Sequence, residues 1–593
     1  MALFNAQISA DPQIAAVHHR SQDPLMPYRP HRRTFVKSLA ALGVAGYTGA
    51  WRTPGWAALA PATGLTELSG DTFELFIEQQ QVTLGGEQRR ALTINGGVPG
   101  PLLRWREGDT VTLRVHNRLD EPTSLHWHGI VLPANMDGVP GLSFHGIAPG
   151  GMYEYRFKVR QHGTYWYHSH SGFQEQIGVY GPLVIEPRET TQPAIREQVM
   201  MLTDWTDQDP ARIFARLKKE PGYYNQNQRT LGDFIHDAGH HGLGNTLRER
   251  WMWARMRMDP TDLADVTGQA YTYLVNGRAP DENFTALFAP GQPLRLRFIN
   301  GSAMTYFDVR IPGLKMTVVA ADGQPVQPVS VDEFRIAVAE TLDVLVQPEA
   351  EGPYTVFAQA MDRSGYARAT LGTRPGVAAP VPELDAPVVL GMADMGMGHG
   401  AMAGMEHGGH ASINMAQAEQ PRHPPTEQGN PLVDMQAMAP TPRLSDPGIG
   451  LRDNGRRVLT YADLRSTFAD PDGREPSRTL ELHLTGHMDK FVWAFDGVKA
   501  GDAEPIRLTY GERVRIVLVN DTMMAHPIHL HGMWSDLEDE EGEFLVRKHT
   551  IDVPPGTRRS YRVSADALGR WAYHCHMLYH MEAGMFREVR VDE

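Results

Sequence analysis

A shortage of cysteine is the first constraint that this sequence sets. Cys575 is the only cysteine in 593 residues, so no disulfide can form within the chain. Positive charge is also scarce, with 56 Lys and Arg against 70 Asp and Glu and a formal net charge of -14. This balance argues against a nucleic-acid-binding protein. The apolar run over residues 38–50 is shorter than the ~20 residues of a membrane-spanning helix, which argues against a retained anchor.

The N-terminal 60 residues have the pattern of an export signal. Residues 31–37, His-Arg-Arg-Thr-Phe-Val-Lys, contain twin arginines, the apolar run follows, and Ala58-Leu59-Ala60 supplies small residues for cleavage. The lack of disulfides alone would indicate a reducing compartment. The signal outweighs that hint, and we expect twin-arginine export to the periplasm, cleavage after Ala60 and no membrane attachment afterwards.

Length and patterning predict several β domains. At about 150 residues per domain, the chain has room for three or four. Beyond the signal, short alternating apolar and polar stretches broken by Gly and Pro are typical of antiparallel strands in sandwiches or barrels. We predict an all-β protein with three Greek-key barrel or sandwich domains over residues 65–190, 197–375 and 451–593, the second with a helical insertion. Residues 376–450 are expected to form a linker.

One sequence unit recurs in each predicted domain. It contains a strand that begins at a glycine and ends nine residues later at an asparagine, and an Asn-Gly or Asp-Gly pair precedes this strand. The glycine and asparagine pairs are Gly108 and Asn117, Gly291 and Asn300, and Gly511 and Asn520. A later strand begins near a second glycine in each copy. This recurrence indicates that the domains are structural duplicates.

The three copies differ where metal ligands can be placed. Nine and eleven residues past the asparagine, the first and third copies have histidines, whereas the second copy has Val309 and Ile311. Five residues past the later glycine, the first and third copies again have histidine and the second has Phe357. The middle domain is therefore expected to have no metal ligands at these positions and to be a spacer or specificity domain.

Cys575 lies in the one stretch able to supply a thiolate ligand. His580 follows five residues later and Met585 ten residues later, which provides one imidazole and the weak axial thioether of a His₂Cys copper site. The flanking His574 and His576 point to the opposite face of an extended strand, so they require a different metal. The alternative is that Cys575 is a small buried apolar residue. Its spacing to His580 and Met585 favours copper.

Four histidine motifs supply the remaining candidate ligands. Neutral imidazoles suit copper, and pairs at i and i+2 on a strand project both rings to one side. A single pair is more often an ordinary core or surface feature, but four pairs at repeated positions favour a metal cluster at a domain interface. The motifs are His126-Trp127-His128-Gly129, His168-Ser169-His170, His526-Pro527-Ile528-His529-Leu530-His531-Gly532 and His574-Cys575-His576.

These motifs resemble the copper signatures of the multicopper oxidases, the family of laccases, ascorbate oxidase and cuprous oxidases. The resemblance covers residues 65–593 and implies three cupredoxin-like domains with four coppers per chain. It implies a type 1 copper held by His526, Cys575, His580 and Met585. It further implies a type 2 copper on His126 and His529, one type 3 copper on His128, His168 and His576, and another on His170, His531 and His574.

The resemblance also implies a reaction. A reductant gives electrons one at a time to the type 1 copper, Cys575 passes them to His574 and His576, and O₂ takes four electrons to become two waters. Asp137 stands where similar oxidases keep an acid near the cluster, although an ordinary Asp-Gly turn residue is an almost equally good interpretation. A second acid often follows the type 1 histidine, and here that position is Met581, so this proton donor stays open.

A methionine-rich segment, Gly391 to His410, suggests the identity of the reductant. Gly, Pro and charged residues surround it, which predicts a flexible, disordered linker between the second and third domains. Thioethers are soft ligands that select Cu(I), whereas drift in a tolerant linker is the alternative explanation. The expected Cu(I) ligands are Met392, Met395, Met397, His399, Met402, Met405, His407 and His410.

Together with the export signal, this stretch narrows the resemblance to the periplasmic copper-resistance oxidases of bacteria. The implied substrates are Cu(I) and O₂, the implied role is copper detoxification, and periplasmic copper-handling proteins are the implied partners. A laccase-like oxidase of phenols is the nearest rival, since its copper sites would be identical. A non-catalytic copper store is the rival from another class, and ten histidines arranged for two kinds of site argue against it.

Overall fold

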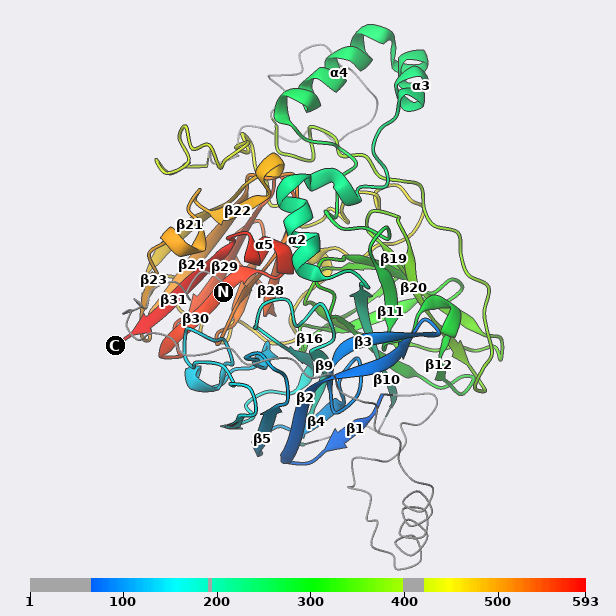
Figure 1. Ribbon diagram of the computed structural model, residues 1–593, viewed down its shortest axis with the longest axis vertical. Helices are drawn as coiled ribbons and strands as arrows, with labels where there is room; N and C mark the ends of the chain where they lie inside the picture. The colour runs from blue at the N-terminus through cyan, green and yellow to red at the C-terminus, as the bar shows by residue number, and fades with distance from the viewer. Residues whose placement is uncertain (1–64, 190–194, 398–420) are drawn as a thin grey trace, which may run out of the picture. The chain divides into compact units, whose positions relative to one another are not determined.

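The computed structural model describes residues 65–189, 195–397 and 421–593, which belong to one compact unit. The predicted export signal in residues 1–60 lies outside them. Strands dominate the described chain and form six sheets in three pairs (Figure 1). We call these pairs domain 1 (β1 to β9), domain 2 (β10 to β20) and domain 3 (β21 to β31). The predicted all-β fold is confirmed.

Domain 1 consists of a four-stranded and a five-stranded sheet. The first has the order β3 (Glu87–Ile94), β2 (Thr72–Leu84), β5 (Thr110–Asn117) and β7 (Met152–Lys158). The second has the order β1 (Glu67–Ser69), β4 (Leu102–Arg106), β9 (Tyr180–Glu186), β8 (Gly163–His168) and β6 (His126–His128). Along β5 the buried Val111, Leu113 and Val115 alternate with more exposed residues, so one face of the sheet packs into the core.

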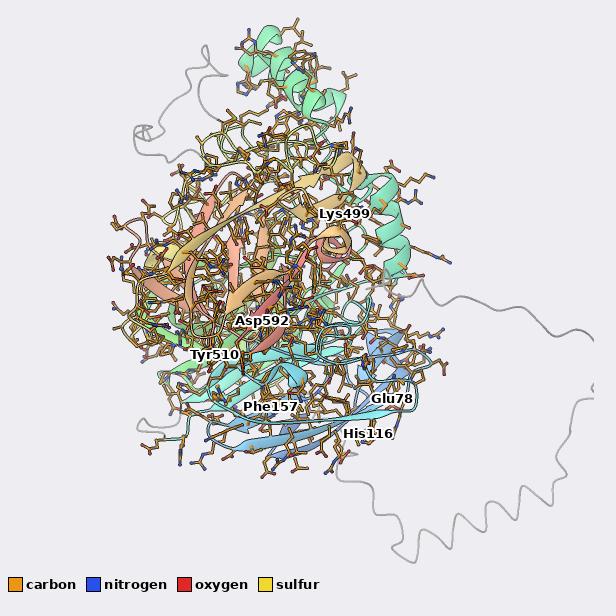
Figure 2. All side chains as sticks on the ribbon, turned by 90° about the vertical axis from the view of Figure 1, so that its left-hand side faces the viewer. Glu78, His116, Phe157, Lys499, Tyr510 and Asp592 are labelled. Atoms are coloured by element: carbon orange, nitrogen blue, oxygen red, sulfur yellow. The ribbon has the colours of Figure 1, made fainter. Side chains whose placement is uncertain are left out.

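The other face of the four-stranded sheet carries charged side chains. His116 Nε2 on β5 lies 2.7 Å from Glu74 Oε2 on β2, and Arg118 forms a 3.1 Å ion pair with Glu78. Figure 2 shows Glu78 and His116 near each other at the edge of this domain. The sheet therefore has one polar and one apolar face, as the alternating sequence predicts.

Domain 2 repeats this plan with a six-stranded sheet in place of the four-stranded one. The six-stranded sheet has the order β11 (Thr272–Val275), β10 (Arg196–Trp205), β13 (Leu294–Asn300), β18 (Thr341–Val346), β15 (Met316–Ala321) and β16 (Gln324–Val331). The five-stranded sheet has the order β12 (Phe284–Leu287), β20 (Tyr366–Gly372), β19 (Tyr354–Ala360), β14 (Phe307–Arg310) and β17 (Glu333–Ile336).

Domain 3 has the same strand order as domain 2. Its six-stranded sheet contains β22 (Val492–Phe495), β21 (Arg478–His487), β24 (Arg513–Asn520), β29 (Arg558–Ser564), β26 (Ser535–Glu538) and β27 (Phe544–Lys548). Its five-stranded sheet contains β23 (Ile506–Thr509), β31 (Phe586–Asp592), β30 (Gly569–Cys575), β25 (His526–Leu530) and β28 (Thr550–Val553). The shared order supports the interpretation of the domains as duplicates.

Each domain also contains parallel strand pairs, which differs from the expected antiparallel arrangement. The pairs β2 with β5, β10 with β13 and β21 with β24 are parallel. Between the two members of each pair, the chain passes through a strand of the opposite sheet. Residue alternation reports which face of a strand is buried and carries no information on the direction of its neighbour, so the sequence pattern could not show this.

Helices are confined to a few segments of the described chain. The insertion in domain 2 contains α2 (Pro210–Lys219), α3 (Leu231–His241) and α4 (Leu243–Met256), and domain 3 contains α5 (Leu578–Glu582). Asp209 caps α2, and Thr230 with Asp233 forms a capping box at α3. Short 3₁₀ turns cover Ala134–Met136, Pro221–Tyr224, Pro280–Glu282, Tyr461–Asp463, Met488–Lys490 and Ala500–Asp502. None of the described helices has the length and apolarity that a bilayer crossing needs.

The repeated Asn-Gly and Asp-Gly pairs form tight turns. Asn95, Asn276 and Asp496 have φ values of 52°, 51° and 54°, in the left-handed region that Asn and Asp tolerate. Each side-chain Oδ1 also accepts a hydrogen bond from the backbone of the neighbouring strand β2, β10 or β21, and the donors are the N–H groups of Phe76, Met201 and His483. The same turn is therefore built three times from the same chemistry.

The asparagine that ends each repeated strand is buried and makes the same set of hydrogen bonds in every domain. Its Oδ1 accepts from the backbone N–H two residues later, and its Nδ2 donates to two carbonyl groups. The carbonyls belong to Glu121 and Ile147 for Asn117, to Thr305 and Ile336 for Asn300, and to Met524 and Val553 for Asn520. This side chain ties the strand to the loop that leads to the next motif.

The described parts of the predicted linker, on either side of residues 398–420, differ from a flexible linker. Met395 is fully buried, and Met435 and Leu444 farther along are also buried. Arg443 Nη2 donates a 2.9 Å hydrogen bond to the carbonyl of Asp394, which joins the two ends. Apolar side chains scattered among the glycines account for this packing, and composition alone did not show that they reach a core. Residues 398–420 lie outside the described chain.

Replacing Asn300 with Ala tests the role of the repeated asparagine in the domain without histidine ligands. The change leaves two buried carbonyls unpaired, so we expect the free energy of unfolding to fall by about 2–4 kcal/mol. Denaturant unfolding of the whole protein measures this. Asn135→Ala, an exposed residue whose backbone carbonyl alone accepts a hydrogen bond, is the control. Equal stability of the two variants would contradict the prediction.

Candidate metal centre

Histidines of domains 1 and 3 lie opposite each other on paired strands. In domain 1, β6 pairs with β8, so that His126 faces His168. In domain 3, β25 pairs with β30, so that His529 faces His574. All four side chains are buried. In both domains the histidines are therefore on hydrogen-bonded strands, which hold them in fixed positions.

Domain 2 has core residues at these positions. Its strands β14 and β19 pair in the same antiparallel way, and Val309, Ile311 and Phe357 are buried apolar residues. They pack inside the domain, so domain 2 offers no imidazole at the positions where the other two domains do.

The two sets of histidines meet where domains 1 and 3 are in contact. The His126 ring stacks on His531 with 3.9 Å between ring centroids, and the His128 ring stacks on His529 at 3.8 Å. His170 lies 5.1 Å from His574 in the same measure. The structure thus brings the eight histidines of the predicted cluster into one buried site, namely His126, His128, His168, His170, His529, His531, His574 and His576.

The candidate donor atoms fall into small sets in which all atoms lie within 4.8 Å of one another. These sets include His128, His168 and His576; His170, His531 and His574; and His126, His128 and His529. The first two coincide with the trios that the resemblance implies for type 3 coppers, and the third contains the pair implied for a type 2 copper. A set of His126, His168 and His170 overlaps them, because all these rings share one small space.

Several of these rings present a nitrogen that lacks a hydrogen-bond partner. These atoms are Nε2 of His126, His170 and His529 and Nδ1 of His128. Elsewhere two nitrogens face each other, with 3.0 Å between Nε2 of His531 and His574 and 3.3 Å between Nε2 of His168 and His576. Unpaired buried polar atoms are costly. Metal ions among them would satisfy these nitrogens, so the residues fit a polynuclear metal site.

Burial keeps the imidazoles of the cluster neutral. It lowers the pKa of His574 to about 4. Burial, followed by repulsion between neighbouring rings, also holds the pKa well below its usual value in His128, His168, His170, His529, His531 and His576. Neutral imidazole is the form that binds metal, and a set of such donors suits copper.

Hydrogen bonds on the outer nitrogens orient most of these rings. His126 Nδ1 donates to the carbonyl of Asp137 at 2.8 Å, and His531 Nδ1 lies 2.9 Å from Asp137 Oδ2. His574 Nδ1 donates to the carbonyl of Cys575 at 2.9 Å. In each case Nε2 is left to face the cluster. Asp137, predicted as an acid near the cluster, thus contacts one ring from the histidine motif of domain 1 and one from domain 3.

Two further residues of the site escaped the sequence analysis. Glu175 Oε2 lies 2.7 Å from His168 Nδ1, and burial raises the pKa of this carboxyl well above its usual range. His549 Nδ1 lies 3.1 Å from His128 Nε2, so Nδ1 is the nitrogen of His128 that has no hydrogen-bond partner and could bind a metal. Glu175 follows His170 by only five residues, a closeness that could have drawn attention to it. No comparable signal in the sequence marks His549.

The thiol of Cys575 lies in a second buried set. Its Sγ is 3.5 Å from His526 Nδ1 and 3.7 Å from His580 Nδ1, and the two nitrogens are 3.1 Å apart. Met585 is fully buried in the same loop, where its carbonyl accepts from Cys575 N–H and its N–H donates to the carbonyl of His580. Two imidazoles, one thiol and a neighbouring thioether are the donor types of a blue-copper site.

The outer nitrogens of this second set also have partners. His526 Nε2 lies 2.8 Å from Thr522 Oγ1, and His580 Nε2 lies 2.7 Å from Asp265 Oδ2. Burial raises the pKa of Asp265 to about 8. Asp265 belongs to domain 2 and is 315 residues from His580, so no local pattern in the sequence indicates this contact. Met581, where a second acid was expected, is instead partly buried against the core.

The two sets are joined within β30 and the residue that follows it. Cys575 contributes to one set, whereas His574 and His576 on either side of it contribute to the other. This is the division onto opposite faces that strand alternation predicts. The shortest covalent connection between the sets is therefore a single peptide unit on each side of Cys575.

The predicted Cu(I) ligands are only partly described. Met395 is buried, and Met392 and Met397 are partly buried against the core. His399, Met402, Met405, His407 and His410 lie outside the described residues. The first three methionines of the segment are therefore packed against the protein.

The sequence matches known proteins along most of its length. Profiles described as multicopper oxidase match residues 77–190, 196–375 and 473–593. The chain is 67% identical over 597 residues to a copper resistance protein A homolog of Pseudomonas syringae pv. tomato, covering 96% of this chain and 100% of that one. It is 60% identical to copper resistance protein A of Escherichia coli, with the same coverage.

Solved structures show the same fold at lower sequence identity. Fet3p, a multicopper oxidase that functions in iron import, superposes with a TM-score of 0.62 at 18% identity, covering 88% of this chain and 91% of that chain. The laccase from Botrytis aclada superposes with a TM-score of 0.60 at 21% identity, covering 91% and 90%. From the three matching profiles and the near-complete alignment with its relatives, we conclude that this chain belongs to the multicopper oxidase family.

Proposed function

We propose that this oxidoreductase oxidises Cu(I) to Cu(II) with O₂ as the electron acceptor, and that it acts in the periplasm after twin-arginine export to provide copper resistance. Family membership and the two buried donor sets support the oxidase chemistry. The relatives named copper resistance protein A support the role. The export pattern in residues 31–60 supports the compartment.

The donor sets suggest how four coppers would be held. A type 1 copper would lie among His526, Cys575, His580 and Met585, and a type 2 copper between His126 and His529. Two type 3 coppers would lie among His128, His168 and His576 and among His170, His531 and His574. Copper in these sites would supply one-electron chemistry at the thiolate and four-electron reduction of O₂ at the cluster.

The residues around Cys575 exclude water and connect the two sets. Cys575, His526 and His580 are fully buried, and the Trp493 ring lies over His580 with 4.2 Å between ring centroids. The hydrogen bond from His574 Nδ1 to the Cys575 carbonyl connects these two residues a second time, in addition to the peptide bond between them. Asp265 of domain 2 contacts the outer nitrogen of His580, so an electron donor is expected to approach from the side where domain 2 meets domain 3.

One observation carries the choice of Cu(I) as the electron donor. The N–H of Leu390, directly before the methionine-rich segment, donates a 2.8 Å hydrogen bond to the carbonyl of Pro260. Pro260 is in the same short loop as Asp265, which contacts His580. The segment is thereby tethered beside the proposed point of electron entry.

A pocket extends from this tether. Leu390, Asp394, Leu263, Met361 and Met523 line it together with other residues. Two thioethers and a carboxylate are suitable contacts for copper in transit. The tether and the pocket together support delivery of Cu(I) by the methionine-rich segment.

Oxygen uptake by the copper-loaded protein tests the proposal directly. Cu(I) is expected to sustain O₂ consumption, whereas phenols without added copper are expected to be turned over slowly. Efficient phenol turnover with no Cu(I) oxidation would favour a laccase-like enzyme. A blue protein that consumes no O₂ with either reductant would indicate a copper store.

Deleting residues 398–415 tests the role of the segment while keeping its packed ends. Loss of soft ligands is expected to raise KM for Cu(I) about tenfold, equivalent to ~1.4 kcal/mol of binding, and to leave phenol oxidation unchanged. Steady-state kinetics with both reductants measures this. An equal loss with both would show that the deletion harms the enzyme in general.

Cys575→Ser tests the assignment of the thiolate. The variant is expected to lose its blue absorption and one copper per chain, and its O₂ uptake should fall by more than the ~10–100-fold that loss of an outer partner typically costs. Visible spectra, paramagnetic resonance and copper analysis measure this. His116→Gln, on the surface of domain 1, should retain all three properties. A Cys575→Ser protein that stays blue would refute the assignment.

Glu175→Gln tests whether the missed carboxyl supports the cluster. Weakening the contact to His168 is expected to reduce copper affinity at the cluster about 10–100-fold. Blue absorption should persist, because Cys575 is unaffected. Copper retention during dialysis against a chelator measures the change, with the exposed Glu189→Gln as control. Unchanged retention would limit Glu175 to a packing role.

A further inference from the structure

A second group of histidines and carboxylates lies in domain 3, apart from the two donor sets described above. His423 and Glu427 come from the chain just after the methionine-rich segment. His483 is on β21, and Asp521 directly follows β24. None of the four is among the ligands assigned to copper, and the proposed oxidase reaction does not use them.

The four side chains direct their donor atoms at one another. His483 Nδ1 lies 2.6 Å from Asp521 Oδ2 and 3.8 Å from Glu427 Oε1. His423 Nδ1 lies 2.9 Å from Glu427 Oε2 and 3.5 Å from Asp521 Oδ2. The two rings are 4.7 Å apart between centroids. Two imidazoles and two carboxylates thus converge on one point from three separate stretches of chain.

This group is buried except at one corner. Asp521 is 0% exposed, His483 1% and Glu427 3%. The His423 side chain is 18% exposed, which leaves a route from solvent. Glu427 Oε1 is buried and has no hydrogen-bond partner. A carboxylate oxygen in that state is unfavourable unless a cation satisfies it.

Three polar atoms of the group also have partners outside it. Ala437 N–H donates to Asp521 Oδ1 at 2.7 Å, and Gln436 Nε2 donates to Glu427 Oε2 at 3.0 Å. His483 Nε2 lies 3.5 Å from Glu481 Oε1, a carboxylate placed to orient the ring. Such outer partners are typical of metal-binding histidines and carboxylates.

The spacing of the four donors suits a four-coordinate ion. Bonds of about 2.0–2.1 Å to a four-coordinate metal would put neighbouring donor atoms ~2.8 Å apart in a square plane, the arrangement that Cu(II) prefers, and ~3.3 Å apart in a tetrahedron. The four separations between imidazole nitrogens and carboxylate oxygens run from 2.6 to 3.8 Å, on both sides of that range. Shifts of less than an ångström would therefore admit an ion.

The net charge of the group also permits a divalent ion to take the place of two protons. Two imidazolium–carboxylate pairs carry no net charge, and two neutral imidazoles with two carboxylates and one divalent cation carry none either. A divalent ion could thus replace two protons without leaving an uncompensated charge in a buried site, which would otherwise be costly.

We propose that His423, Glu427, His483 and Asp521 bind a divalent transition-metal ion, with Cu(II) preferred, at a site separate from the oxidase coppers. Nitrogen and oxygen donors without sulfur disfavour Cu(I), and among divalent first-row ions such sites bind Cu(II) most tightly. The site stands on its own geometry and does not depend on the proposed oxidase function.

The position of Asp521 connects this site to the thiolate centre. The next residue, Thr522, contacts His526 Nε2 through its hydroxyl group. Occupation of the site is therefore expected to alter the hydrogen bond on a ligand of the blue copper. A small shift of the blue absorption on metal binding provides a readout that is independent of activity.

Titration with Co(II) tests the proposal, using protein that has been dialysed against a chelator until it retains only its four oxidase coppers, so that this further site is empty of Cu(II). Bound Co(II) has visible ligand-field bands that report nitrogen and oxygen ligands. We expect one equivalent to bind, with a rise in the thermal unfolding midpoint. Glu427→Gln and His423→Gln should each weaken Co(II) binding at least tenfold. His487→Gln is the matched control, because His487 is also on β21 but pairs with Asp434 alone, at 3.1 Å.

Three outcomes would overturn the proposal. The wild-type protein could show neither Co(II) bands nor a Co(II)-dependent shift in its unfolding midpoint. The two variants could retain Co(II) while their blue absorption shows an intact fold, which would leave a buried ion-pair network only. Co(II) bands that vanish on deletion of residues 398–415 but persist in Glu427→Gln would place the ion on the methionine-rich segment instead.

Discussion

The alternation of side chains around Cys575 is the constraint on which the rest of the site depends. An extended strand places successive residues on opposite faces, so Cys575 reaches His526 and His580 while His574 and His576 reach the histidines of domain 1. The thiolate set and the histidine cluster are consequently neighbours in the covalent chain. Any other local conformation of this stretch would separate the thiol from its partners or the two histidines from theirs.

That constraint requires domains 1 and 3 to be held in fixed positions relative to each other, and domain 2 contributes to this although it supplies no histidine ligand. Asp322 of domain 2 accepts hydrogen bonds from the backbone N–H groups of His549 and Thr550 at 3.1 Å and pairs with Lys548 at 2.9 Å. His549 in turn contacts His128. Domain 2 also supplies Asp265 to His580. The expected spacer domain is therefore a support for both donor sets.

The paired strands explain why so many candidate ligands were recognisable in the sequence. In the four histidine-pair motifs of domains 1 and 3, both ligands come from one short stretch, and their i, i+2 spacing follows from strand geometry. The repeated asparagines and Asn-Gly turns were also visible, because each serves a local hydrogen-bonding pattern within its own domain. The direction of neighbouring strands and the packing of the methionine-rich ends depend on contacts between distant residues and were not visible.

By itself, the sequence determined the all-β class, the threefold repeat, the twelve candidate copper ligands and the family resemblance, because local spacing and residue type carry that information. Only the tertiary structure decided which groups contact the outer nitrogens of the ligand histidines. Asp265, Glu175 and His549 reach their partners through domain packing, and the group around Glu427 assembles from three separate stretches. Such contacts depend on how strands and domains pack, and no periodicity along the chain records them.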